Sequence, residues 1–199
     1  MKTYLSFDLD YYNYTSTTLK MLAKIEKTLN DITAFSQEYR VPVLAVMNHQ
    51  QLLTDVNNSQ CDTLINVDTH SDLVAYEDSF ELNCGTWVSY VKWRKNGSYF
   101  WIHADETSYG DCSGDAQIFV AGRRYNTDWR RCFHKRSKLF PELGPDIKSI
   151  GVCLSPDYVD SYGKVLNIFK KWVKLNNIPY LKGRTDESFG RKIYPSCRG

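Results

Sequence analysis

Residues 63–72 of the chain, TLINVDTHSD, join a short apolar run to a cluster of acids and a histidine. The run Thr63–Val67 has the length of a buried β-strand, and the polar residues after it mark the end of the strand. Alternate residues of a strand point the same way. We therefore expect Asp68 and His70 to face one site, with Asp72 returning to it from the turn just beyond.

Two earlier runs have the same design, an apolar strand that ends in residue types able to bind metals. Tyr4–Leu9 contains the sequence SFDL and is followed by a second acid, so that Asp8 and Asp10 stand at alternate positions. Val43–Met47 leads into Asn-His-Gln, with His49 at its centre. The carboxyl ends of parallel strands share one edge of a sheet, where ligands of open α/β folds bind. The three clusters are therefore predicted to converge.

The segments between and after these strands predict how the sheet is covered. Residues 19–39 repeat apolar residues at the helical period, with Ser16 or Thr17 as a cap. Buried strands that alternate with amphipathic helices indicate an α/β fold, here a three-layer αβα sandwich with a mainly parallel sheet. A length of 199 residues suits a single domain, 1–199. Further expected elements are strands at 99–103, 118–121 and 150–154, helices near 86–94 and at 162–175, a loop at 104–116, a turn at 140–146 and a partly disordered tail at 183–199.

Composition and charge narrow the function classes. The chain has 25 Lys and Arg against 23 Asp and Glu, so its net charge is 25 minus 23, or +2, and general basicity does not favour nucleic-acid binding. It contains no apolar stretch of the ~18 residues that a membrane span needs and no secretory signal pattern. The six cysteines are widely spaced, which favours reduced thiols. We therefore expect a cytoplasmic protein without a membrane partner.

The strand ends together supply four carboxylates and two imidazoles. Such hard oxygen donors with two nitrogens suit a pair of Mn²⁺ ions better than one zinc ion, which normally takes about four ligands. Two divalent cations also balance four buried carboxylates that would otherwise repel one another. Taken singly, each block has a simpler explanation as a helix cap, a turn or a hydrogen-bonded histidine. The six predicted metal ligands are Asp8, Asp10, His49, Asp68, His70 and Asp72.

These motifs resemble those of the arginase and agmatinase superfamily of binuclear manganese hydrolases. Its signatures are a strand ending at a His, an Asp-x-His-x-Asp strand end and a Ser-x-Asp-x-Asp strand end, and this chain contains all three. The resemblance implies an arginase/deacetylase-like fold in which Asp68 and Asp8 bridge two ions. The remaining ligands would divide between the ions in pairs, His49 with Asp72 and His70 with Asp10.

The order of the motifs departs from ordinary arginases. There the Ser-x-Asp-x-Asp block lies well C-terminal to Asp-x-His-x-Asp, whereas here the block at 6–10 comes first, as in a circular permutation, and the chain is much shorter. Such an order is compatible with the site, which depends on strand positions in the sheet. The chain is similar in style to compact peptide arginases, which convert arginine side chains of a ribosomal peptide to ornithine and release urea.

Three other functions stay open on the sequence alone. A small-molecule ureohydrolase would act on arginine or agmatine. A deacetylase-like amidohydrolase would share the wider fold but use one zinc ion. A peptide-recognition scaffold would keep the fold without catalysis.

The resemblance also calls for residues that bind substrate and move protons. Asp157, in the sequence LSPDY after a predicted strand, is a candidate to pair with the guanidinium, with Tyr158 beside it, although Ser-Pro-Asp is also a common turn. Ordinary arginases carry a histidine in the loop after Asp-x-His-x-Asp, and the matching stretch 81–87 has none. His103, at a strand end, is a candidate proton donor or simply a hydrogen-bonded histidine. Asn83 is a candidate substrate contact or a helix cap.

The segment 123–138 concentrates basic residues with interleaved aromatic ones. It suits an acidic leader of an arginine-containing peptide partner, and its alternative is a solvated, partly helical face. The sequence does not predict an oligomeric state.

Overall fold

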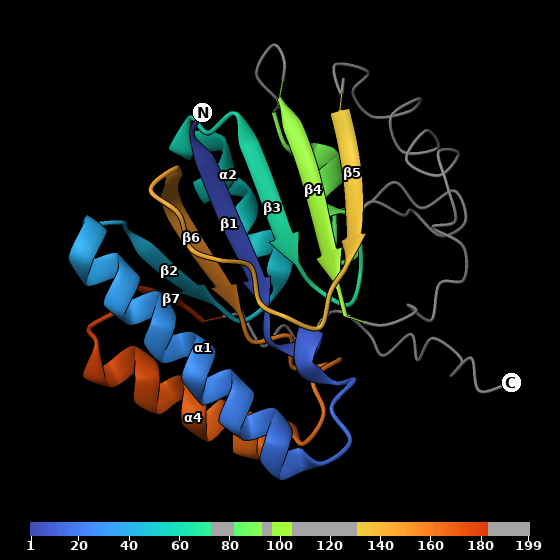
Figure 1. Ribbon diagram of the computed structural model, residues 1–199, viewed down its shortest axis with the longest axis vertical. Helices are drawn as coiled ribbons and strands as arrows, with labels where there is room; N and C mark the ends of the chain where they lie inside the picture. Colours follow the sequence, from blue (N-terminus) through green and yellow to red (C-terminus); the bar gives the residue numbers. More distant parts are fainter. Residues whose placement is uncertain (73–81, 93–96, 105–130, 183–199) are drawn as a thin grey trace, which may run out of the picture.

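A computed structural model describes residues 1–72, 82–92, 97–104 and 131–182 (Figure 1). Within these ranges, seven strands form one sheet in the order β5-β4-β3-β1-β6-β2-β7, and each neighbouring pair is parallel. The predicted α/β fold with a mainly parallel sheet is therefore confirmed. The strands are β1 (Thr3–Asp8), β2 (Val43–Val46), β3 (Thr63–Val67), β4 (Ser98–His103), β5 (Arg131–Arg136), β6 (Ile147–Cys153) and β7 (Tyr180–Leu181).

Helices cover both faces of the sheet, so the fold has three layers, with the sheet in the middle. The long helices α1 (Thr18–Tyr39) and α4 (Tyr162–Leu175) lie side by side on one face, and α2 (Leu53–Ser59) lies on the other (Figure 1). The alternation of β1 explains the arrangement, because Leu5 and Phe7 belong to the core under α1 and α4 whereas Tyr4 belongs to the core under α2. Three short 3-10 helices complete the described elements: η1 (Leu9–Tyr12), η2 (His49–Leu52) and η3 (Trp87–Tyr90).

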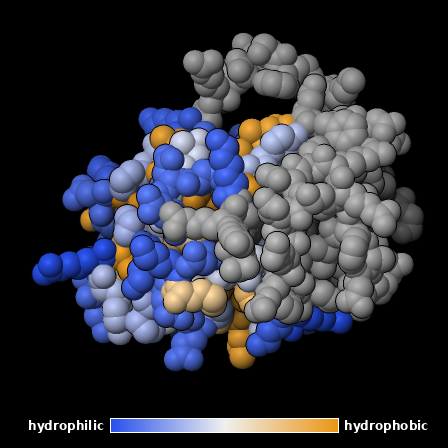
Figure 2. Space-filling model, turned by 90° about the horizontal axis from the view of Figure 1, so that it is seen from above, coloured by the Kyte–Doolittle hydropathy of each residue, from blue (hydrophilic) through white to orange (hydrophobic). Residues whose placement is uncertain are grey.

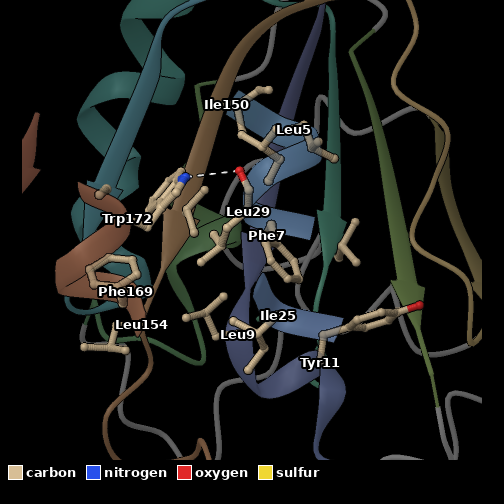
Figure 3. Close-up of a cluster of buried hydrophobic side chains, with 14 of the residues drawn as sticks. Leu5, Phe7, Leu9, Tyr11, Ile25, Leu29, Ile150, Leu154, Phe169 and Trp172 are labelled. Atoms are coloured by element: carbon tan, nitrogen blue, oxygen red, sulfur yellow. Dashed lines mark hydrogen bonds between the residues drawn. The ribbon is translucent and has the colours of Figure 1, made fainter. Parts of the chain in front are cut away.

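Helix α1 begins and ends where its sequence provides caps. The Thr17 hydroxyl accepts a hydrogen bond from the Lys20 N–H, which confirms one of the two predicted caps. Arg40 ends the helix in the left-handed conformation, with φ of 54°, and Pro42 follows. The apolar face of α1 packs against α4 and the sheet (Figure 3), where the Trp172 indole N–H donates to the Leu29 carbonyl at 3.1 Å. This core fixes the first strand against its two helices.

Several predicted elements differ from the structure or lie outside its described ranges. The helix expected near 86–94 is only the short η3, because the segment leaves the helix at Val91, and 93–96 lie outside the described residues. The strand at 118–121, most of the loop at 104–116 and the tail at 183–199 also fall outside them. Strands β5 and β7 were not predicted, since β5 reads as a mostly basic segment and β7 has only two residues. β5 and β7 are the two edge strands of the sheet.

The two ends of the sheet differ in character. Figure 2 views the molecule from the end where the strands begin, and the described residues there are mostly hydrophilic, with hydrophobic residues in small separate patches. At the other end, the carboxyl ends of β1, β2, β3, β4 and β6 gather along one edge (Figure 1). All six predicted metal ligands follow or end strands at this edge. No helix within the described residues is long and apolar enough to cross a membrane.

Candidate metal centre

The structure brings together all six residues that the sequence predicted as metal ligands. Asp8 ends β1 and Asp10 lies in the following η1, His49 begins η2 after β2, and the other three follow β3. Five of the six side chains are buried, and the sixth, His70, is 19% exposed. Four buried carboxylates around two imidazoles are unusual in a protein core unless a cation compensates them.

His49 lies at the centre of one half of the cluster. Its Nδ1 atom is 2.8 Å from Asp72 Oδ2, 3.1 Å from Asp68 Oδ2 and 3.3 Å from Asp8 Oδ2. On the other side of the ring, Nε2 is 2.6 Å from the Ser6 hydroxyl oxygen. When Nε2 carries the proton and donates it to Ser6, Nδ1 is left as a lone pair aimed at the carboxylates. A second hydrogen bond of this kind is the usual way in which a ligating histidine is oriented.

His70 organises the other half around a carboxylate that both halves share. Its Nδ1 atom is 3.2 Å from Asp10 Oδ2 and 3.7 Å from Asp68 Oδ1. Since His49 approaches Oδ2 of the same side chain, the two oxygens of Asp68 face two different histidines. The donors therefore form two overlapping groups, each within 4.8 Å, that have Asp68 in common: His49, Asp68 and Asp72 in one, and Asp10, Asp68 and His70 in the other.

Residues outside the predicted ligand set hydrogen-bond to its members and hold them in place. The Trp87 indole N–H donates to Asp72 Oδ2 at 2.6 Å, and the Ser155 hydroxyl donates to Asp8 Oδ2, also at 2.6 Å. The Asn66 amide donates to Asp68 Oδ2 at 3.3 Å. Asn66 and Ser6 each stand two positions before a ligand on the same face of a strand, so a polar residue inside an apolar run was a usable signal. Trp87 carried no such signal, because it lies in the segment that was predicted only as a helix near 86–94.

The backbone is strained at two positions of this centre. Asp72 and Ser155, neither of them glycine, have φ of 54° and 52°, in the left-handed region. Non-glycine residues in that region cost of order 1 kcal/mol or more and concentrate at functional sites, where the surroundings fix them. At both positions the side chain reaches the cluster, Asp72 Oδ2 at 2.8 Å from His49 Nδ1 and the Ser155 hydroxyl at 2.6 Å from Asp8 Oδ2.

The charges of the cluster shift the pKa values of its members in opposite directions. Burial, and then the charges of neighbouring aspartates, raise the pKa values of Asp8 and Asp10, and burial raises the pKa of Asp72 to about 7. Burial also opposes ionisation of Asp68, yet its hydrogen bonds to the two histidines lower its pKa overall. The carboxylates in turn outweigh burial at His70 and raise its pKa to about 12. Without a metal, the cluster therefore retains protons in place of cations.

The donor set fits a pair of hard divalent cations. Apart from its 3.2 Å ion-pair contact with His70 Nδ1, Asp10 Oδ2 is buried without a hydrogen bond, so a cation held by these two residues would take the place of the proton between them. Oxygen and imidazole ligands suit Mn²⁺, and a carboxylate shared between two groups suits a bridge between two ions. The residues present could thus hold divalent metal ions.

The predicted substrate and proton-transfer residues lie at different distances from this centre. The Tyr158 ring meets the His70 ring edge-on at 5.2 Å, and the Cys84 thiol is 3.7 Å from the Tyr158 hydroxyl. Asp157, next to Tyr158, is exposed in the turn after β6. Tyr158 therefore contacts one of the predicted ligands, and Asp157 is its exposed neighbour in the chain.

The other two candidates have local structural partners. The Asn83 side chain accepts a hydrogen bond from the Gly85 N–H at 2.8 Å in the turn before η3, whose N-cap is Thr86, so Asn83 does not cap that helix as the alternative expected. The His103 ring stacks on Trp101 at 4.3 Å, and the Trp101 indole donates to the Asp68 carbonyl at 3.0 Å. His103 is therefore linked to the cluster through Trp101. In the basic segment 123–138, residues 123–130 lie outside the described residues.

Comparisons of the chain with protein-family models, with curated proteins and with solved structures find no match.

Proposed function

We propose that the protein is a binuclear manganese hydrolase that converts arginine in a peptide to ornithine and urea. The single observation that carries the proposal is the placement of Asp68, whose two carboxylate oxygens face two different histidines in two overlapping ligand groups. A single metal ion needs only one of these groups. The pair of groups with a shared carboxylate supports a two-ion centre.

Each ion would be held by residues that the structure already brings together. His49, Asp72 and Asp68 would hold one ion, Asp10, His70 and Asp68 the other, and Asp8 would join them as a second shared carboxylate. When bound, two such cations lower the pKa of water and stabilise the negative charge that develops during hydrolysis. Ser155 and Trp87 would keep one oxygen of Asp8 and of Asp72 oriented by their hydrogen bonds.

The more open side of the centre suits a planar cationic substrate. Among the metal ligands His70 is the most exposed, and the neighbouring Tyr158 is 43% exposed, whereas His49 lies buried against Trp87. A guanidinium group can stack on the Tyr158 ring and pair with the exposed Asp157 carboxylate. An exposed aromatic residue at the rim favours a side chain presented on a peptide over a small molecule that is enclosed on all sides.

Metal content is the first test of this proposal. We expect close to two Mn per chain after loading and dialysis. Asp68→Asn should lose both ions and all urea release, whereas Asp146→Asn, an exposed acid at the opposite end of the sheet, should lose neither. One zinc per chain would instead favour a deacetylase-like amidohydrolase, and little bound metal would favour a non-catalytic scaffold. Full urea release by Asp68→Asn would overturn the two-ion assignment.

The substrate is tested separately with the manganese-loaded protein. Arginine-containing peptides, free arginine and agmatine are compared for urea release, and peptides are analysed by mass spectrometry for loss of CH₂N₂ from an arginine. We expect release from peptides well above that from the free compounds. Release from agmatine or free arginine alone would reassign the protein as a small-molecule ureohydrolase.

A further inference from the structure

A fully buried thiol lies beside the candidate metal centre and has no role in the proposed reaction. Cys153 is the last residue of β6, the strand that runs between β1 and β2. It is the register partner of Asp8 on one side and of Val46 on the other. Neighbouring strands are about 4.8 Å apart, so partners that point to the same face lie in contact range. Since His49 follows β2 closely, Cys153 lies between the two strands that deliver an aspartate and a histidine.

The three side chains form a ligand group of their own. One donor atom from each of Asp8, His49 and Cys153 lies within 4.8 Å of the other two, and all three residues are at most 2% exposed. This group differs from the two that contain Asp68, because it offers one sulfur, one nitrogen and one oxygen. Zinc and cadmium readily take thiolate ligands, whereas Mn²⁺ prefers oxygen. The chemistry of the group therefore points away from manganese.

The thiol is held in this position by its packing. Cys153 belongs to the buried cluster that contains Val46 and Leu52, and its thiol makes a long contact, 3.6 Å, to the Met47 carbonyl. It is one of the free cysteines of the described chain, so no disulfide removes it from metal binding. A fixed, reduced thiol next to two further ligands is what a zinc site with protein ligands requires.

We propose that Asp8, His49 and Cys153 form a second mode of metal binding, which takes up zinc or cadmium. In this mode the dication forms a bond to sulfur as the thiol proton leaves to solvent, and no electrons are transferred. Asp8 and His49 are also ligands of the proposed manganese centre, so the two modes exclude each other at these residues. Zinc or cadmium is thus an inhibitory occupant of the centre. The proposal depends on the ligand geometry and needs no arginine substrate.

Cadmium–thiolate absorption in the near ultraviolet provides the test. Metal-free full-length protein is titrated with Cd²⁺, alone and after loading with Mn²⁺, and released Mn²⁺ is followed by electron paramagnetic resonance. We expect a charge-transfer band that saturates at one Cd²⁺ per chain and rises together with Mn²⁺ release. Cys153→Ser should lose the band and still bind Mn²⁺.

Cys84→Ser is the matched control, because Cys84 is a second described thiol near the centre, with its sulfur 3.7 Å from the hydroxyl of Tyr158, whose ring contacts His70. It should keep the full band. A band that survives in Cys153→Ser and disappears in Cys84→Ser would overturn the proposal, and so would the absence of a band in the unaltered protein. If Cys153→Ser does not fold, Cys153→Ala, which suits the apolar surroundings, replaces it with the same expected loss. A cadmium band without any Mn²⁺ binding would support this site and reject the manganese hydrolase.

Discussion

Trp87→Phe is the substitution that tests most directly how the two halves of the centre are held. Trp87 is fully buried, its indole N–H donates to Asp72 Oδ2 at 2.6 Å, and its ring lies 5.0 Å from that of His49. Phenylalanine keeps an aromatic ring against His49 but has no donor. The substitution therefore removes one hydrogen bond to a buried carboxylate and, because the phenyl ring is smaller than the indole, leaves a small cavity that lowers the free energy of unfolding.

The size of the effect follows from the nature of that bond. Hydrogen bonds to charged groups contribute about 1.5–3 kcal/mol, and a factor of ten in affinity corresponds to about 1.4 kcal/mol. We therefore expect Trp87→Phe to weaken the ion held by Asp72 and His49 by about 10- to 100-fold, the range found when outer hydrogen bonds to metal ligands are removed. The other ion keeps Asp10 and His70, so its affinity should change much less.

Calorimetric titration with Mn²⁺ separates the two ions by their affinities. The matched control is Trp172→Phe, which also removes indole hydrogen bonds, to Leu29 and Thr33, but in the core on the opposite face of the sheet. It should lower the free energy of unfolding and leave both metal affinities unchanged. Equal weakening of both ions in Trp87→Phe, or no weakening at all, would show that the indole hydrogen bond does not orient Asp72.

Three further outcomes are expected. Ser155→Ala removes the donor to Asp8 Oδ2 and should weaken Mn²⁺ binding by about tenfold, whereas unchanged binding in calorimetry would mean that the 2.6 Å contact does not orient the ligand. Mn²⁺ at about a hundred times its Kd should raise the free energy of unfolding by about 2.7 kcal/mol per ion, measured by denaturation with and without a chelator, and an unchanged midpoint would contradict a native metal centre. Tyr4 should contribute to alkaline unfolding, because burial and then Asp55 raise its pKa. The contribution of Tyr4 to the free energy of unfolding is complete below its unfolded-state pKa of about 10 and falls by about 1.4 kcal/mol per pH unit above it. The free energy of unfolding of Tyr4→Phe should therefore fall less steeply with pH above about 10 than that of the unaltered protein. Identical slopes would exclude Tyr4 as a cause of alkaline unfolding.

The sequence predicted which acids and histidines gather at the centre better than it predicted the residues that support them. Asp8, Asp68 and His70 were predictable because strand alternation and the shared edge of a parallel sheet are general rules. The same rules could also have identified Ser6 and Asn66, because each is a polar residue within an apolar run and faces the same side of the strand as a predicted ligand. Their hydrogen bonds, from Ser6 to His49 and from Asn66 to Asp68, confirm that both residues lie at the site.

The remaining supports depend on contacts between distant segments. Trp87 reaches Asp72 from a short 3-10 helix, and nothing in the local pattern indicates its direction. Ser155 depends on a left-handed backbone conformation, which sequence rules assign to glycine before serine. Strand β5 was missed because apolar runs are the signal for buried strands, and an edge strand with several basic residues lacks that signal. Packing of particular side chains, and not periodicity, decides these features.

The place of β1 in the sheet has a consequence for how the protein folds. Although it comes early in the chain, β1 is flanked by β3 and β6, and the hydrogen bond from Ser155 to Asp8 closes a separation of 147 residues. Pairings of such long range form slowly, because the chain must lose much entropy before they are made. Until β6 arrives, β1 has one open edge beside a cluster of acids, and an open edge is a site of aggregation. Divalent cations should therefore act late in refolding and raise the yield of native protein more than its rate of collapse.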